Sequence, residues 1–313
     1  MKYIGIDMSK DTFHACFDDG KVEVFKNTRD GIQTFERVGK GKEHKKKETI
    51  IGIEATGVYH HLFCLTVSKN GWTVMIINPL LVSQMIRDGL RMVKNDVKDA
   101  RIIREAVMQG KGYRFTDTSE ILALKALVSE RADLVEMRGD LKRRQHAHEM
   151  REVACDTSLH DSYGTTFVTL TKEIKIIEKQ MKCMVPETQE LLRSIPGIGI
   201  TASALLVAFV GDIKRFDHPD KLVAYIGIDP RVKQSGTSIH SKGPITKRGN
   251  ALLRHVLYQS AFIAKRHNLV FGRYYAKKKG EGKHHTSVLC ALERKLIHTI
   301  WAVWKRGTPF EER

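Results

Sequence analysis

The first third of the chain alternates short apolar runs with segments of helical spacing. Apolar runs that predict strands cover residues 3–6, 12–17, 21–25, 49–53 and 72–76, and helices are expected over 30–38, 58–68, about 80–90 and about 97–109. The turn Asp18-Asp19-Gly20 joins the second run to the third, which predicts a β-hairpin. A basic segment over residues 39–47 is expected to be a flexible loop. Hairpin strands followed by strand–helix units predict a mixed α/β sheet.

The middle of the chain has a different pattern. From Asp117 to about Met181 there is no proline, and apolar residues recur at helical spacing with dense charge between them. This pattern predicts two long helices, an antiparallel pair broken near residues 157–164, which together form a coiled-coil arm. Helices of this length and charge usually serve as spacers or as oligomerisation arms, so no chemistry is assigned to them.

The last segment is predicted to be mainly helical. Helices are expected up to Ser194 and over residues 200–210, 219–225, 249–266 and 285–305, with a long irregular polar stretch over about 230–248. The turn that contains Gly197 and Gly199 has the form of a helix–hairpin–helix turn, whose glycines let backbone amides approach a phosphate closely. Such a turn can also be purely structural. The patterns divide the chain into an α/β domain (1–112), a helical arm (113–185) and a mainly α domain (186–313).

The net charge of the chain indicates the class of its partner. The 313 residues include 53 Lys and Arg against 36 Asp and Glu, for a net charge of +17, and residues 231–283 hold 13 of the cations against one acid. Such a surplus favours a polyanion, bound more weakly as salt rises. The apolar runs are too short for a membrane span and the start lacks signal-peptide features, so we expect a cytoplasmic protein with no membrane partner.

Four carboxylates are candidate metal ligands. Asp7 and Glu54 follow two apolar strands, and Asp96 and Asp99 share one face at the start of a predicted helix. Oxygen ligands that converge at one sheet edge suit Mg²⁺ or Mn²⁺, which serves phosphodiester chemistry. Each acid taken singly also fits a cap or turn residue, and Asp96 in particular would make a good helix N-cap.

A stretch of small hydroxyl residues and cations forms the second candidate. It contains Ser235, Ser238 and Ser241, and its cations are Arg231, Lys233, Lys242, Lys247 and Arg248, with Arg254 shortly after. Backbone N–H groups and cations of this kind can surround a phosphate and lower the cost of a serine oxyanion. The alternative is a loop that grips phosphate without covalent chemistry.

The residues around both candidates carry a family resemblance. Tyr-Ile-Gly-Ile-Asp7-Met-Ser-Lys, Ile-Gly-Ile-Glu54-Ala-Thr-Gly-Val-Tyr and Asn-Asp96-Val-Lys-Asp99-Ala resemble the N-terminal domain of the DEDD insertion-sequence transposases. That resemblance implies a RuvC-type, RNase H-like fold in which the four acids form the catalytic, metal-binding tetrad. Arg-x-x-x-Ser235-Gly-x-Ser, followed by Lys-Gly and Lys-Arg-Gly-Asn-x-x-Leu-Arg, resembles the C-terminal domain of the same family. It implies Ser235 as the nucleophile, with Ser238 and Ser241 as rivals.

The resemblance also implies a reaction and its partners. The family cleaves and rejoins DNA with Mg²⁺ (or Mn²⁺) through a 5′-phosphoserine intermediate, in a composite site, and mobilises an insertion element. Element-end DNA, target DNA and a structured guide RNA from the element are the implied partners. Several strands must be handled together, so a homodimer or homotetramer is expected, with the helical arm as candidate interface. The setting is the nucleoid of a bacterial or archaeal cell.

Two alternatives stay open. A metal-dependent nuclease or Holliday-junction resolvase would use the acidic tetrad alone and form no covalent link to DNA. A nucleic-acid-binding protein with an inactive site would bind without cleavage. Arg254-His255-x-x-Tyr258 faintly suggests a tyrosine recombinase, but the ordered set of activating residues is not evident.

Overall fold

The structure, a computed structural model, describes residues 1–55, 57–88, 95–150, 157–235 and 239–312. The chain forms two compact units, unit 1 (Met1–Ser119) and unit 2 (Glu120–Arg313). Residues 120–185 of the predicted helical arm lie in unit 2 together with the C-terminal helices, whereas residues 113–119 lie in unit 1, and the division into three domains stays a prediction. In the described part of the chain, no helix is long and apolar enough to cross a membrane.

Unit 1 is built around a sheet with six strands among its described residues. Their order in space is β3 (Val22–Lys26), β2 (Thr12–Cys16), β1 (Lys2–Met8), β4 (Thr49–Glu54), β5 (Thr73–Ile77) and β6 (Tyr113–Arg114). β1, β4 and β5 run parallel, and the other pairings are antiparallel. The helices are α1 (Arg29–Gly41), α2 (His60–Lys69), α3 (Pro79–Asp88) and α4 (Asp96–Met108). The mixed α/β sheet is confirmed, and it is consistent with the RNase H-like fold that the resemblance implies.

Two local expectations for unit 1 are wrong. Residues 39–41 belong to α1 rather than to a loop, because Gly39 is buried and packs its backbone near Trp72, where an added Cβ would lie 3.6 Å from the indole. β6 was not expected, since two exposed residues carry no alternation. It forms through its pairing with β5, where Met75 lies opposite Arg114 and Ile76 opposite Tyr113.

Alternation along the strands gives the sheet of unit 1 two different faces. On one face, the ring of Phe13 lies 5.8 Å from that of Phe35 in α1 and 5.1 Å from that of Phe63 in α2. Aromatic pairs of this kind add about 0.5–1.5 kcal/mol each beyond their burial. Successive side chains point to opposite faces. Gly5 and Asp7 therefore lie on the other face, which α4 covers.

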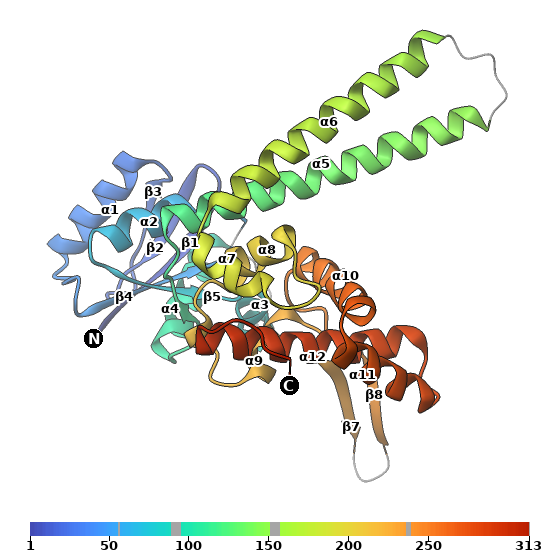
Figure 1. Ribbon diagram of the computed structural model, residues 1–313. Helices are drawn as coiled ribbons and strands as arrows, with labels where there is room; N and C mark the ends of the chain where they lie inside the picture. The colour runs from blue at the N-terminus through green and yellow to red at the C-terminus, as the bar shows by residue number, and fades with distance from the viewer. Residues whose placement is uncertain (56, 89–94, 151–156, 236–238, 313) are drawn as a thin grey trace. The chain divides into compact units, whose positions relative to one another are not determined.

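The arm of unit 2 consists of α5 (Ser119–Glu149) and α6 (Thr157–Cys183). The two helices run antiparallel and form a long hairpin in Figure 1, and a 2.8 Å ion pair joins Arg131 to Glu178 between them. The expected break at 157–164 is wrong, because these residues are helical. Hydroxyl side chains in α6 donate to carbonyls one turn earlier, as Thr166 does to Ser162 at 2.9 Å, so this polar segment is compatible with a helix.

The rest of unit 2 is mainly helical, as expected. Its elements are α7 (Pro186–Arg193), α8 (Ile200–Val210), the 3₁₀ turn η1 (Ile213–Arg215), α9 (Pro219–Ile226), α10 (Ala251–His267), α11 (Leu269–Gly280) and α12 (His285–Arg306). α8 is apolar on nearly all sides and lies in the core, where Leu206 is fully buried with Leu257 of α10 and Leu296 of α12. α11 was not expected as a separate helix. Asn268 ends α10 and caps α11 by accepting a bond from the Phe271 amide.

The stretch expected to be irregular is a β-hairpin. β7 (Pro230–Ser235) pairs antiparallel with β8 (Ile239–Ile245), and we call these two strands the serine hairpin. Its polar composition gives no apolar alternation that could have predicted strands. Backbone pairing, which any side chain permits, forms them instead.

Candidate functional site

The first two carboxylates of the predicted tetrad lie on neighbouring strands. β1 and β4 pair in parallel, with Ile6 opposite Ile53 as the last described partners. Asp7 and Glu54 are the next residue of each strand, so both reach the same end of the sheet. Glu54 also lies opposite Ile77 of β5.

Two glycines allow α4 to lie directly on this part of the sheet. Gly5 and Gly52 are register partners. A Cβ on Gly5 would come within 2.1 Å of the Ala100 carbonyl oxygen, and one on Gly52 within 2.1 Å of a Val107 methyl. Each glycine stands two residues before a carboxylate, so glycine and acid share a face of the strand. The close approach of α4 therefore takes place on the face that carries Asp7 and Glu54.

α4 begins with the other two acids of the tetrad. Asn95 is its N-cap, and its side chain accepts a 3.0 Å bond from the Val97 amide. The alternative interpretation of Asp96 as a cap is therefore wrong, and its carboxylate is available for another role. Asp96 is 62% exposed at the side chain, whereas Asp99 is buried. We call Asp7, Glu54, Asp96 and Asp99 the carboxylate cluster; among the residues that the structure describes, Asp7 and Asp96 belong to a group of three potential metal ligands, and Glu54 and Asp99 do not.

Burial and neighbouring charges act on the pKa of Asp7. Burial raises the pKa of Asp7, and the negative charges of Asp99 and then Asp96 raise it further. His14 and a hydrogen bond from the Met8 amide lower the pKa by less. A carboxylate that is costly to ionise among like charges is one whose ionised form a divalent cation would stabilise.

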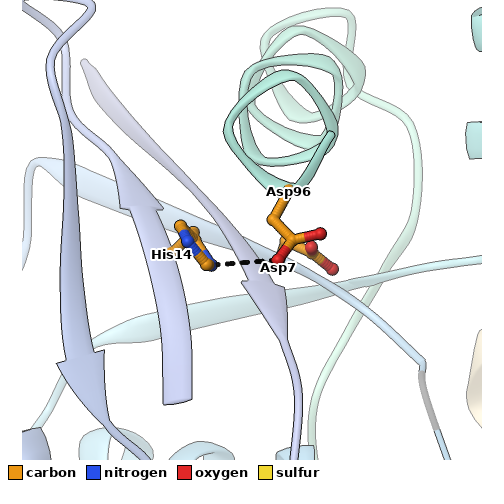
Figure 2. A group of neighbouring side chains, drawn as sticks. All are labelled: Asp7, His14 and Asp96. Carbon is orange, nitrogen blue, oxygen red and sulfur yellow. Dashed lines mark ion pairs between the residues drawn. The ribbon is translucent and has the colours of Figure 1, made fainter. Parts of the chain in front are cut away.

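His14 is a member of the site that the sequence reasoning missed. It lies directly opposite Asp7 in the β1–β2 pairing, and its Nδ1 is 3.9 Å from an Asp96 carboxylate oxygen. Figure 2 shows the side chains of Asp7, His14 and Asp96 turned toward one another, and their ligand atoms all lie within 4.8 Å of each other. Two oxygens and one nitrogen at this spacing fit a divalent cation. The register of the hairpin that β1 and β2 form would have identified His14.

The backbone places Ser235 at the end of β7, where it pairs with Ile239. In the same register Lys233 lies opposite Ser241, and Val232 lies opposite Lys242. The side chains of residues 232–242 lie outside the described part of the chain, as does Ser238 altogether. The choice among the three serines therefore stays a prediction.

The base of the serine hairpin is held by several contacts. The Thr246 hydroxyl donates to the Asp229 carboxylate, and Arg254 donates through Nη1 to the carbonyls of Ile226 (3.1 Å) and Gly249. A Cβ on Gly249 would lie 2.2 Å from the Tyr225 carbonyl oxygen, so the chain before α10 packs tightly on the end of α9. These contacts hold the chain on either side of the serine hairpin against the end of α9 and the start of α10.

The candidate nucleic-acid residues of unit 2 fall into two groups. Arg231, Lys247 and Arg248 are exposed, whereas the Arg254 guanidinium makes the structural contacts just described. A nucleic-acid role for Arg254 stays a prediction.

The helix–hairpin–helix-like turn lies between α7 and α8. Gly197 has φ +87° and is packed against α10, where a Cβ would lie 2.3 Å from the Ser260 carbonyl oxygen. A Cβ added to Gly199 would meet nothing within 4 Å, and Gly199 is the N-cap residue of α8. The turn therefore has a structural role at Gly197, and Gly199 leaves room for a phosphate to approach.

Comparison with known proteins places both halves of the chain in one family. Residues 189–276 match the family described as "Transposase IS116/IS110/IS902 family", and residues 4–149 match the DEDD transposase domain of IS110 elements, described as "Transposase". The "Pilin gene-inverting protein" of Moraxella bovis is 28% identical across 99% of this chain and 98% of its own length. The "Transposase for insertion sequence element IS1328" of Yersinia enterocolitica is 28% identical over the same shares. The "Transposase for insertion sequence element IS1111A" of Coxiella burnetii is 27% identical over 99% of this chain and 91% of its own.

The match over residues 4–149 contains all four members of the carboxylate cluster, and the match over residues 189–276 contains the serine hairpin and its base. The chain belongs to the IS116/IS110/IS902 family of insertion-sequence transposases, with a DEDD transposase domain at its N-terminal end.

Proposed function

We propose that this transposase cleaves and rejoins DNA strands with a divalent cation held by the carboxylate cluster and with Ser235 as nucleophile. The observation that carries the metal part is the pair of glycines that bring α4, with Asp96 and Asp99, onto the face of Asp7 and Glu54. A family match over the same residues supports it. The proposed cation is Mg²⁺ or Mn²⁺.

The residues of the carboxylate cluster have different proposed roles. Asp7, half-buried beside Asp99, would be the principal ligand, because burial and two neighbouring acids disfavour its ionised form and a cation would stabilise that form. Asp96, exposed at the start of α4, would close the outer side of the site toward the DNA. Glu54 would complete the set from the neighbouring strand. When bound, the cation would supply charge stabilisation at the phosphate and at the leaving oxygen.

The proposed covalent step joins Ser235 to the DNA. Its Oγ attacks the scissile phosphorus and loses its proton. The bond from phosphorus to the 3′ oxygen breaks, and that oxygen leaves as a 3′ hydroxyl after it takes up a proton. The product is a 5′-phosphoserine, and attack by the 3′ hydroxyl of another strand restores the serine and rejoins DNA. The fixed base of the serine hairpin supports this role, because a nucleophile needs a defined approach.

Nucleic acids are the proposed partners. Arg231, Lys247 and Arg248 are exposed around the hairpin base and would contact phosphates, with Lys233 and Lys242 along the strands and Gly199 at its turn. We extend the proposal to a structured guide RNA of the element, which the basic charge of the chain would suit. This part rests on the family resemblance.

A homodimer or homotetramer is the proposed active form, since two DNA ends and a target must be handled together. The arm of α5 and α6 would act as a coiled-coil interface. Its exposed apolar side chains support this role, because Met137 is 55% and Val168 is 53% exposed.

Covalent capture tests the proposal. The protein, Mg²⁺, element-end DNA and the element's non-coding RNA are incubated and separated on a denaturing gel. We expect a protein–DNA adduct that is lost in both Ser235→Ala and Asp7→Ala. Cleavage without an adduct, unchanged in Ser235→Ala, would contradict the serine mechanism and leave a metal-dependent nuclease. Binding without cleavage would indicate an inactive site.

A further inference from the structure

The β1–β2 pairing places a histidine in the carboxylate cluster, and the proposed function gives it no role. His14 is held from both sides, because β2 pairs with β1 at Asp7 and with β3 at Val24. Its neighbours Phe13 and Ala15 are fully buried on the opposite face of the strand. The backbone of His14 is therefore fixed, and its ring must project on the side of Asp7 and α4.

We propose that His14 is a nitrogen ligand of the cation in the carboxylate cluster and gives this site a preference for Mn²⁺ over Mg²⁺. The inference rests on the proposed function, since it needs the cation to bind there. Its geometric basis is the common distance limit of 4.8 Å among one ligand atom each of Asp7, His14 and Asp96.

The separation of these groups fits a metal site better than a hydrogen-bonded ion pair. The side chain of His14 is 18% exposed and that of Asp96 is 62% exposed. At 3.9 Å, the Nδ1 of His14 is too far from the Asp96 oxygen for a hydrogen bond, but the separation leaves room for an ion between the two atoms. Asp7, on the inner side, supplies the third atom.

The chemistry of the nitrogen determines the preference. Mg²⁺ is small and hard and takes oxygen ligands in a near-ideal octahedron, whereas a first-row transition ion such as Mn²⁺ accepts an imidazole more readily. Replacing the imidazole by an amide, as in His14→Gln, offers an oxygen of similar reach. The substitution should therefore weaken Mn²⁺ binding about 10-fold and change Mg²⁺ binding much less.

A spectroscopic test reads the ligand directly. The full-length, metal-stripped protein is titrated with Mn²⁺, and electron spin-echo modulation is recorded for the nitrogen coupling of a bound imidazole. We expect this coupling in the wild type and its loss in His14→Gln. It should persist in His146→Gln, a control that removes a histidine whose Nδ1 lies 3.7 Å from one carboxylate, that of Glu149.

A second variant separates this inference from the proposed function. Asp7→Asn should abolish Mn²⁺ binding at the site together with the coupling. Asp7-dependent Mn²⁺ binding without nitrogen coupling, or coupling that persists in His14→Gln, would overturn the role of His14 alone. Mn²⁺ binding that does not depend on Asp7 would overturn the metal site itself.

Discussion

The carboxylate cluster of unit 1 and the serine hairpin of unit 2 obtain their geometry in different ways. The cluster sits where a helix lies directly on a sheet, and close packing at Gly5 and Gly52 sets its dimensions. The serine hairpin extends from its unit, with Ser235 five residues beyond Pro230, or about 16 Å at roughly 3.3 Å per residue. Its base is fixed by side chains, through contacts such as Asp229 with Thr246.

This difference suits the two proposed tasks. Metal ligands must keep their distances within tenths of an ångström, which a packed interior provides. A nucleophile that is carried to a strand of DNA needs reach and a fixed direction. Substitutions at the carboxylate cluster should therefore act on metal binding and stability, and substitutions along the serine hairpin should act on DNA attachment.

Asp7→Asn should have the largest effect. Adduct formation should fall by about 10³-fold or more, as for loss of a principal catalytic group. Stability without metal should hold or rise, because burial and two neighbouring acids raise the pKa of Asp7. For an acid with a raised pKa in the folded state, ionisation costs stability as pH increases, and asparagine removes that cost. Adduct rates and thermal melting in chelator measure both effects, with the exposed Asp11→Asn as control.

Gly5→Ala should have the next largest effect, because the new methyl would meet the backbone of α4 at 2.1 Å. We expect a loss of about 3 kcal/mol in the free energy of unfolding, together with weaker metal binding. Gly41→Ala, where nothing lies within 4 Å of the added atom, should stay within about 0.5 kcal/mol. Chemical denaturation of both variants measures the difference, and equal losses would refute the packing explanation.

Glu293→Gln should change how stability depends on pH. Burial in α12 raises the pKa of Glu293 to about 8, and Arg254 lowers it by less. The folded protein therefore binds a proton that the unfolded chain has released, and stability falls as pH rises from about 4.5 to about 8. The variant should lose this slope and gain up to about 5 kcal/mol above pH 8. The prediction would be contradicted if the melting temperatures of the two proteins changed in parallel from pH 5 to pH 9.

Substitution of two arginines near the hairpin base should separate an effect on stability from an effect on DNA binding. Arg254→Met removes the bonds to Ile226 and Gly249 and should cost about 1.5–3 kcal/mol in stability. Arg231→Met should leave stability within about 0.5 kcal/mol, since Arg231 is exposed and its bond to Thr246 is long at 3.4 Å. It should instead weaken DNA binding and reduce the salt dependence by about one phosphate contact. Denaturation and salt titrations of DNA affinity test this pair.

The sequence predicted most of the elements but not the contacts that complete the sites. Apolar periodicity located β1, β4 and α4 because those elements bury side chains on a regular face. It missed the serine hairpin, whose strands are polar and form through backbone pairing. His14 was missed because its role depends on strand register, and the contacts of Arg254 because they join α9 to the start of α10.

Sulfur substitution at the scissile phosphate tests most directly the claim that both regions act on one phosphodiester. A non-bridging oxygen is replaced by sulfur, and the Ser235 adduct is measured with Mg²⁺ and with Mn²⁺. Sulfur binds Mn²⁺ far better than Mg²⁺, since Mg²⁺ is the harder ion. We expect the adduct to be lost in Mg²⁺ and restored in Mn²⁺ for one of the two sulfur isomers. An adduct that forms equally with either metal, for both isomers, would contradict the account.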